Sequence, residues 1–216
     1  MLSHRYAPGA VALLLTAPVL VLAQSPTLAE RPAWKPGERW EYRVLDAWNN
    51  NETDRVTVTF ERQDGDRLLG LRQAKSKPDP VATRADLDGN NCVPMLDGGQ
   101  EVCAQITVFP LKVGNQSEYS KFPFPNRQGH SQGRCTVAGT ESVTVPAGQF
   151  DTLKIECKGF WNYTAGQASS GTLLQTYWYA PAVGRAVRLY IESHTPQGLP
   201  NNKTLTEMVS HTRPGS

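Results

Sequence analysis

The segment CTVAGTESVTVPAGQFDTLKIEC, residues 135–157, predicts a β-hairpin closed by a disulfide. Apolar and polar residues alternate on both sides of the Pro-Ala-Gly sequence at 146–148, which is typical of strands that bury one face. Pro and Gly supply the backbone angles of a tight turn. When the second strand runs back along the first, Cys135 and Cys157 lie nearly opposite, where Cα atoms are about 4.5 to 5.5 Å apart and within disulfide reach.

The same alternation recurs along the rest of the chain. It is seen at 40–44, 56–60 and 187–191, and turn-forming sequences such as Asp64-Gly-Asp66 separate the segments. We therefore predict an all-β fold of eight or more strands in a single antiparallel curved sheet, as a half-barrel, barrel or sandwich, with little helix. The helical alternative is a short helix within 72–86, where two prolines oppose a long one.

The chain has four cysteines, and an even number in an exported protein favours two disulfides. A four-ligand zinc site is the alternative, but it usually shows Cys-x-x-Cys pairs, which the sequence lacks. Of the three possible pairings we predict Cys92 with Cys103 and Cys135 with Cys157. Pro94 cannot donate to a strand ladder, so we expect the 92–103 loop to be irregular.

The N-terminus has the pattern of a secretory signal peptide. Arg5 precedes an apolar run that ends in Val21-Leu-Ala23, with small residues suited to cleavage after Ala23. An uncleaved anchor is the alternative, although the run is short for a membrane-spanning helix. We predict a signal peptide at 1–23 and a single soluble β domain at 24–216, periplasmic or secreted. No cysteine stands near the cut, so we expect no lipoprotein anchor.

The charge balance argues against electrostatic partners. Arg5 is the one counted charge within 1–23, so the remainder has 21 basic and 20 acidic residues. Such a near-neutral chain predicts no binding to nucleic acid or to anionic membranes. We also expect no transmembrane segment in the mature chain.

Several motifs together resemble a broad set of exported bacterial β-proteins of unknown function. They are Trp34-Lys-Pro-Gly-Glu-Arg-Trp40-Glu-Tyr42, Phe109-Pro-Leu-Lys-Val-Gly114, Val143-Thr-Val-Pro-Ala-Gly-Gln-Phe150 and Trp178-Tyr-Ala-Pro-Ala-Val-Gly184. The resemblance implies a curved-sheet, half-barrel architecture similar to periplasmic lipoprotein carriers. It brings no catalytic residues, and it carries fold better than function.

The sequence Gly129-His-Ser131-Gln-Gly133 fits the Gly-x-Ser-x-Gly pattern of a nucleophile elbow. An elbow needs a buried strand before the serine and a helix after it, whereas here a Pro-rich stretch precedes it and a strand-like one follows. Asp151 with His194 or His211 would satisfy the chain order of a hydrolase. The alternating helices of that fold are missing, so we predict a solvated loop, no catalytic residues and no enzyme activity.

We expect no metal site and no cofactor. The histidines of the mature chain are not paired at ligand spacing. The segment Asp86-Leu-Asp-Gly-Asn90 begins like a calcium loop, but its later positions do not fit, and a plain turn is favoured. Asn51, Asn115, Asn162 and Asn202 are glycosylation sequons only in a source that glycosylates them.

Two main functional hypotheses follow. The first is a periplasmic carrier-like module that binds a hydrophobic ligand, lipid or lipoprotein on a concave sheet face, because the chain has more aromatic residues than a flat sheet must bury. Candidate ligand-binding residues are Trp40, Tyr42 and Trp178, although such aromatics are more often core. The second is an envelope protein that binds partners through a sheet edge or the 122–126 segment. A serine hydrolase using Ser131 is the third.

Overall fold

A computed structural model describes residues 27–95, 100–124, 129–164 and 169–215. Twelve strands form one antiparallel sheet in the order β7-β6-β5-β4-β3-β2-β14-β13-β12-β11-β10-β9, and β1 pairs separately with β8. The strands are β1 (Leu28–Ala29), β2 (Arg39–Asp46), β3 (Asn51–Asp64), β4 (Arg67–Ala74), β5 (Lys77–Ala85), β6 (Asn91–Pro94), β7 (Glu101–Cys103), β8 (Leu111–Lys112), β9 (Gln116–Pro123), β10 (Gly129–Val145), β11 (Gly148–Tyr163), β12 (Ser169–Ala180), β13 (Arg185–His194) and β14 (Pro200–Thr212).

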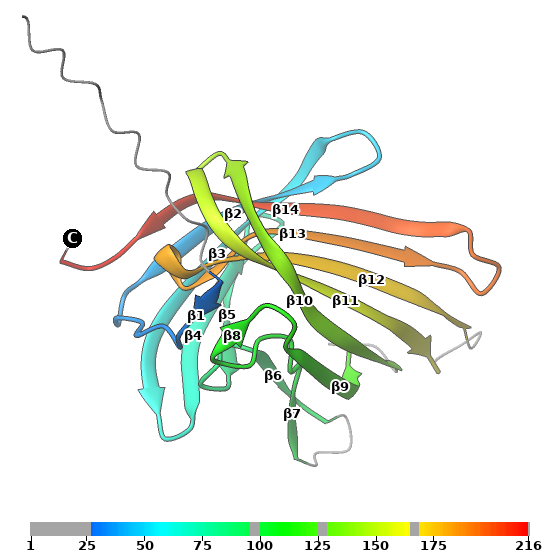
Figure 1. The fold of residues 1–216 in the computed structure, drawn as a ribbon, viewed down its shortest axis with the longest axis horizontal. Coiled ribbons are helices and arrows are strands. Elements are labelled where there is room, and N and C mark those ends of the chain that lie inside the picture. Colours follow the sequence, from blue (N-terminus) through cyan, green and yellow to red (C-terminus); the bar gives the residue numbers. More distant parts are fainter. Residues whose placement is uncertain (1–26, 96–99, 125–128, 165–168, 216) are drawn as a thin grey trace, which may run out of the picture.

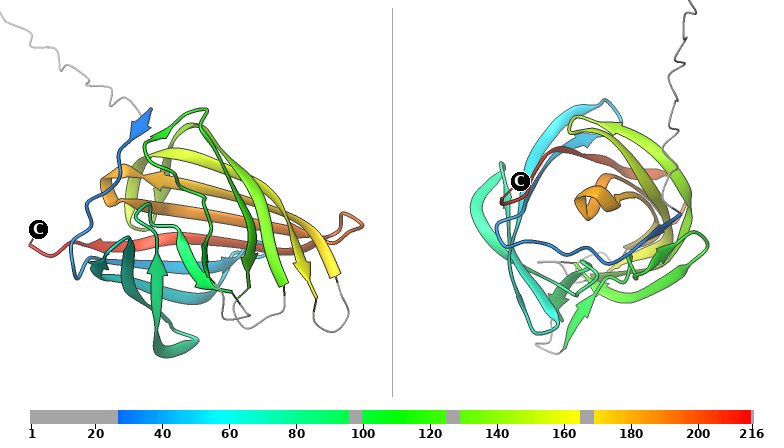
Figure 2. Two further views of the ribbon diagram at one scale, coloured as in Figure 1. Left: turned by 90° about the horizontal axis from the view of Figure 1, so that it is seen from below. Right: turned by 60° about the vertical axis from the view of Figure 1, so that its left-hand side comes forward.

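The sheet curls into a nearly closed, barrel-like shape (Figures 1 and 2). Its two edge strands, β7 and β9, come beside each other, and the Ser117 hydroxyl donates a hydrogen bond to the Ile106 carbonyl, 3.3 Å away. Register shifts in most strand pairs mark β-bulges, which increase the local bend and twist that closure requires. The prediction of an all-β fold with one curved antiparallel sheet is confirmed.

The hairpin predicted around residue 146 has the expected register. Cys135 lies directly opposite Cys157, and Val145 lies opposite Gly148 across the turn. Both cysteine side chains point into the core, with 1% and 3% of their surface exposed. The structure joins Cys135 to Cys157 and Cys92 to Cys103, so the predicted pairing is confirmed and the zinc alternative is wrong.

One local expectation is wrong for the described residues that flank the 92–103 loop, and the helical alternative within 72–86 is wrong. Cys92 and Cys103 lie opposite each other in a regular β6–β7 ladder, because Pro94 stands at the end of β6 and costs no interior hydrogen bond. The possible helix within 72–86 is instead the β4–β5 hairpin. In the described part of the chain, the one helical element is the 3-10 turn η1 (Pro181–Val183), which ends at Gly184 in the left-handed conformation (φ 64°).

The buried residues form two apolar clusters, one around the Cys135–Cys157 disulfide and one around Trp40. Beside the second cluster lies Glu38, which is fully buried at the start of β2. Its carboxylate lies 2.8 Å from His211 Nε2 and accepts a hydrogen bond from Arg213 Nε at 3.0 Å. This network fixes the end of β14 against the beginning of β2. Among the described residues, no helix has the length and apolar character needed to cross a membrane.

Candidate functional site: the interior pocket

A pocket of about 230 Å³ lies inside the curled sheet, and we call it the interior pocket. One wall comes from β11, β12 and the start of β13, and the other from the connections on either side of β6 and β7. The 3-10 turn η1 lies within the ring of strands, as the right view of Figure 2 shows. The lining residues are Trp34, Asp88, Gly89, Asn90, Asn91, Ile106, Thr107, Ile155, Tyr177, Tyr179, Gly184, Arg185 and Ala186.

The sheet wall follows directly from strand alternation. Tyr177 and Tyr179 stand on the same face of β12, and Ile155 of β11 lies directly opposite Tyr177. Their neighbour Trp178 points to the other face, because successive strand residues alternate. The tyrosines and Ile155 therefore present an apolar surface to the interior of the fold.

This apolar surface continues beyond the interior pocket. Leu189 lies opposite Tyr177, and Ile191 lies opposite Gln175. On β12, Gln175 is two residues from Leu173 and two from Tyr177, so these side chains point to the same face. All of these positions share the concave face and are only partly buried. We call Leu173, Tyr177, Leu189 and Ile191 the concave strip.

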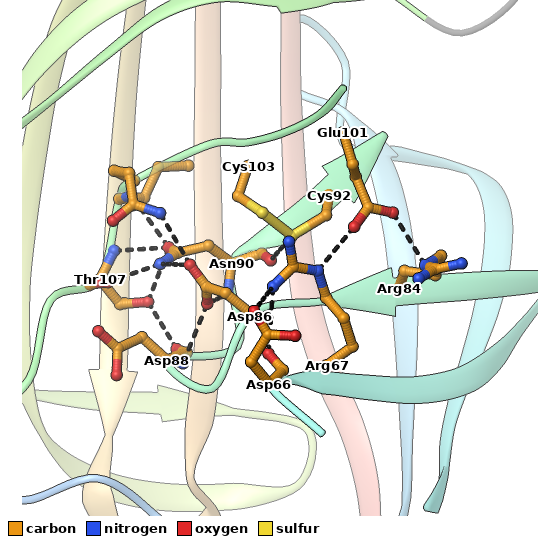
Figure 3. The surroundings of a disulfide bond; sticks show 12 residues. Asp66, Arg67, Arg84, Asp86, Asp88, Asn90, Cys92, Glu101, Cys103 and Thr107 are labelled. Carbon is orange, nitrogen blue, oxygen red and sulfur yellow. Dashed lines mark hydrogen bonds and ion pairs between the residues drawn. A yellow bond between two sulfur atoms is a disulfide. The ribbon is translucent and has the colours of Figure 1, made fainter. Parts of the chain in front are cut away.

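The opposite wall is held by the turn at 86–90. The Asn90 side chain accepts hydrogen bonds from the backbone N–H groups of Ile106 and Thr107 and donates to the Thr107 carbonyl at 2.7 Å. Asp86 accepts from Gln105 and from Asn90 (Figure 3). The neighbouring Cys92–Cys103 disulfide ties β6 to β7, so the segment that carries Ile106 is fixed across the interior.

Arg185 brings a positive charge to the pocket wall. It follows Gly184, whose left-handed backbone turns the chain out of η1 and into β13. The guanidinium lies over the Trp40 ring, 4.9 Å from its centroid, a cation–π contact. Burial raises the pKa of the nearby Tyr42 hydroxyl, and the positive charge of Arg185 opposes that rise.

Two buried donors in the pocket wall, the Trp34 indole N–H and the Tyr179 hydroxyl, have no hydrogen-bond partner among the described residues. Burial raises the pKa of Tyr179, with Arg185 acting in the opposite direction, so the hydroxyl keeps its proton and remains a donor at neutral pH. Trp34 packs against the turn glycines from both walls, since a Cβ on Gly89 or Gly184 would meet its ring within about 3 Å. An unpaired buried donor costs about 1 to 3 kcal/mol.

Trp34 also separates the interior pocket from two neighbouring pockets. A small one of about 40 Å³ is lined by Trp34, Trp40, Phe60 and Arg185, among others. The other, of about 320 Å³, lies between the 31–34 segment and Phe60, Leu68 and Leu87. Trp34 lines all three pockets.

The three candidate aromatics occupy different environments. Trp40 is fully buried, donates its indole N–H to the Val183 carbonyl and borders the small pocket. Tyr42 donates to the Ala186 carbonyl at 3.2 Å, and it therefore supports the strand that carries Arg185. Trp178 lies on the other face of β12, where its indole N–H donates to Glu141.

Ser131 is not in a solvated loop. It lies within β10, opposite Trp161 on β11, and only 5% of its surface is exposed. Gly129 and Gly133 leave room for neighbouring rings, since a Cβ on Gly133 would meet the Tyr119 side chain at 3.0 Å. The glycines that suggested a turn are therefore packing positions within a strand.

The structure does not assemble a triad around Ser131. Asp151 lies opposite Ser142, which places it about 35 Å from Ser131 along the hairpin at the usual rise per strand residue. Ser131, Trp161 and Gly171 lie opposite one another on β10, β11 and β12, so they share one face of the sheet. His194 lies opposite Thr172, the residue after Gly171. Because adjacent strand residues alternate, His194 and Ser131 lie on opposite faces of the sheet. His211 is engaged at Glu38.

Among the described residues, no group of three His, Cys, Asp or Glu side chains is placed to hold a metal ion. Asp86 and Asn90 close the predicted turn and bind the 105–107 segment rather than converging on a cation. The four sequon asparagines are all exposed. The predicted signal peptide at 1–23 and part of the 122–126 segment lie outside the described residues.

Little in the sequence predicts this pocket. Tyr177 and Tyr179 alternate in Thr-Tyr-Trp-Tyr-Ala, which shows that they share a face but not that the space before them stays open. Arg185 and Ile106 stand in no motif of binding sites. Trp34 lies in a motif that resembles exported proteins, but its contacts with Gly89 and Gly184 depend on the tertiary fold.

No protein-family model and no curated protein sequence matches this chain. Among solved structures, a candidate lipoprotein from Parabacteroides distasonis ATCC 8503 is similar, with a TM-score of 0.51 and 14% identity over 85% of this chain and 99% of that one. A candidate exported protein with a YmcC-like fold from Bacteroides fragilis NCTC 9343 has a TM-score of 0.47 at 14% identity, covering 86% and 100%. The hypothetical lipoprotein YmcC from Escherichia coli K12 has 0.38 at 12%, covering 82% and 85%.

The likeness to the Parabacteroides protein shows a shared fold. It confirms, at the level of architecture, the predicted similarity to exported bacterial β-proteins. At 14% identity it shows nothing of function, which has to be argued from the pocket itself.

Proposed function

We propose that this chain is an exported, non-catalytic binding protein whose interior pocket holds a small hydrophobic ligand. The observation that carries the proposal is the pocket's volume of about 230 Å³ together with its wall of Ile106, Ile155, Tyr177 and Tyr179. Apolar cavities of about 150 Å³ already bind benzene, and ligand sites are typically concave and mostly apolar with a few polar groups. The concave strip extends the apolar surface for a longer ligand.

Export is supported by chemistry and by pattern. Two disulfides form and persist in oxidising compartments such as the bacterial periplasm. The apolar run that ends at Ala23 has the features of a secretory signal. The structurally similar protein from Parabacteroides distasonis is described as a candidate lipoprotein, which is also an exported class.

A non-catalytic role is supported by the residue types in the pocket. Its lining contains no histidine, cysteine or serine among the described residues. Its one carboxylate, Asp88, is held by Arg31, 2.6 Å away. Among its hydroxyl groups, burial raises the pKa of Tyr177 and of Tyr179, which makes both poor general acids at neutral pH.

The proposal is tested by titrating the protein with N-phenyl-1-naphthylamine, a neutral apolar dye that fluoresces when it leaves water. Ile106→Trp should fill the pocket from the connecting segment and weaken dye binding about tenfold or more. Leu199→Trp is the matched control, because Leu199 is 64% exposed in the β13–β14 turn and far from the lining. Absence of saturable binding by the unmodified protein, or equal weakening by both variants, would contradict the proposal.

The alternative of an envelope interaction protein has one observation in its favour. Phe160 is 58% exposed and Leu174 38% exposed, as diagonal neighbours on the outer face of β11 and β12. The sheet edges give less support to an interaction protein, because the edge strands β7 and β9 lie beside each other and leave less edge open to a partner strand. On this alternative, substitutions at Phe160 would impair function in cells while pocket-filling at Ile106 would not.

A further inference from the structure

Arg185 differs from two other arginines of the sheet, which lie on strands β2 and β13. Arg43 and Arg188 both pair with Glu207, at 2.6 and 2.8 Å. Arg185 makes no ion pair with any carboxylate in the part of the chain that the structure describes. Its guanidinium instead rests on the Trp40 ring. A partly buried cation is usually paired, because the loss of hydration is otherwise uncompensated.

The interior pocket places two unpaired hydrogen-bond donors together with Arg185, whose own hydrogen-bond interaction is with the neutral Tyr42 hydroxyl. The Tyr179 hydroxyl and the Trp34 indole N–H line this pocket, are buried, and lack partners in the part of the chain that the structure describes. Tyr179 is 4% exposed, so bulk water does not satisfy its hydroxyl. One guanidinium and two unpaired donors in a single pocket match a ligand group that accepts several hydrogen bonds and carries negative charge.

The carboxylate on the opposite wall does not cancel this match. Asp88 accepts from Arg31 in an ion pair of 2.6 Å, so its charge is already balanced. It also accepts a long hydrogen bond from the Phe109 backbone N–H. Arg185 therefore remains the uncompensated charge of the interior pocket.

We propose that Arg185 binds the anionic head of an amphipathic ligand, a carboxylate or phosphate, whose apolar part lies against Tyr177, Ile155 and the concave strip. This inference rests on the proposed function and names its ligand class. Arg185 can make two parallel hydrogen bonds to a carboxylate or phosphate, a geometry that lysine cannot offer. The aromatic ring of Trp40 holds the guanidinium in place before the ligand arrives.

The test compares octanoate with 1-octanol, two probes with the same chain length, one with and one without a charge at neutral pH. Each is titrated against bound N-phenyl-1-naphthylamine. The unmodified protein should bind octanoate about tenfold more tightly than 1-octanol, in line with a charge-assisted hydrogen bond. Arg185→Gln should abolish this preference, so that the affinities of the variant for octanoate and 1-octanol lie within about twofold of each other.

Arg134→Gln is the matched control, since it removes one positive charge at a site that is 65% exposed and paired with the equally exposed Glu118. It should keep the octanoate preference. Arg185→Lys, which retains the charge, should keep part of the octanoate preference. Urea unfolding shows whether each variant is folded. Acetate serves as the free anion without a chain and should not displace the dye.

The outcomes separate this inference from the proposed function. Dye and 1-octanol binding without any octanoate preference in the unmodified protein would overturn the inference alone. Loss of preference in Arg134→Gln as much as in Arg185→Gln would also overturn it, because it would indicate a general effect of net charge. Failure of all apolar probes to bind would overturn the proposed function, and displacement by acetate as well as by octanoate would indicate a free-anion site instead.

Discussion

The Cys135–Cys157 disulfide should contribute strongly to stability. We predict that replacing both residues by alanine lowers the free energy of unfolding by about 3.4 kcal/mol. The value follows from the chain-entropy relation for a closed loop, with a sequence separation of 22 between the two cysteines. Stabilities of single domains are about 5 to 15 kcal/mol, so this loss would be a large share of the total.

The measurement is urea unfolding followed by tryptophan fluorescence, with thermal unfolding by circular dichroism. For a domain of this size each kcal/mol lowers Tm by about 2 to 4 °C, so the double variant should melt about 7 to 14 °C lower. The matched comparison is the double alanine variant of Cys92 and Cys103, whose separation of 11 gives about 2.8 kcal/mol by the same relation.

The comparison also identifies what would refute the reasoning. A loss below about 1 kcal/mol for the Cys135–Cys157 variant would show that loop closure in the unfolded chain is not the source of the stabilisation. A clearly larger loss for the Cys92–Cys103 variant would show that the sheet edge, rather than the central hairpin, limits stability. Peptide mapping without reductant should recover the two pairs and no free thiol.

Two further substitutions test the buried contacts. Glu38→Gln should lower the free energy of unfolding by about 2 kcal/mol in urea, because it removes a fully buried carboxylate that accepts hydrogen bonds from the Arg213 side chain and the Lys35 backbone. Glu41→Gln, with 40% of the Glu41 side chain exposed, should stay within about 0.5 kcal/mol. Equal effects would refute the role of burial. Gly171→Ala should lower the free energy of unfolding by about 2 kcal/mol or more, because the added Cβ would meet a backbone oxygen and the Trp161 ring. Gly139→Ala is the control and should be nearly neutral, because the space around Gly139 is open. Tolerance of Gly171→Ala would show that β12 and β13 shift easily.

Much of the fold was accessible from the sequence because the relevant signals are local. The hairpin register follows from the number of residues between Cys135 and Cys157 and from the turn at 146–148, and the structure reproduces it. The prediction of a loop at 129–133 is wrong because glycine occurs both in turns and at close packing positions. In β10, Gly133 leaves space for the Tyr119 ring, a requirement set by a neighbouring strand.

The sequence by itself determined which residues face the same side of each strand, where the chain turns, and which cysteines can meet. These properties depend on backbone geometry and on short separations along the chain. Only the tertiary structure decided that the space before Tyr177 and Tyr179 stays open and that Arg185 and Trp34 border it. The physical reason is that the pocket exists between a twelve-stranded curled sheet and the segments that cross its interior, and local periodicity does not specify how far two distant segments stand apart.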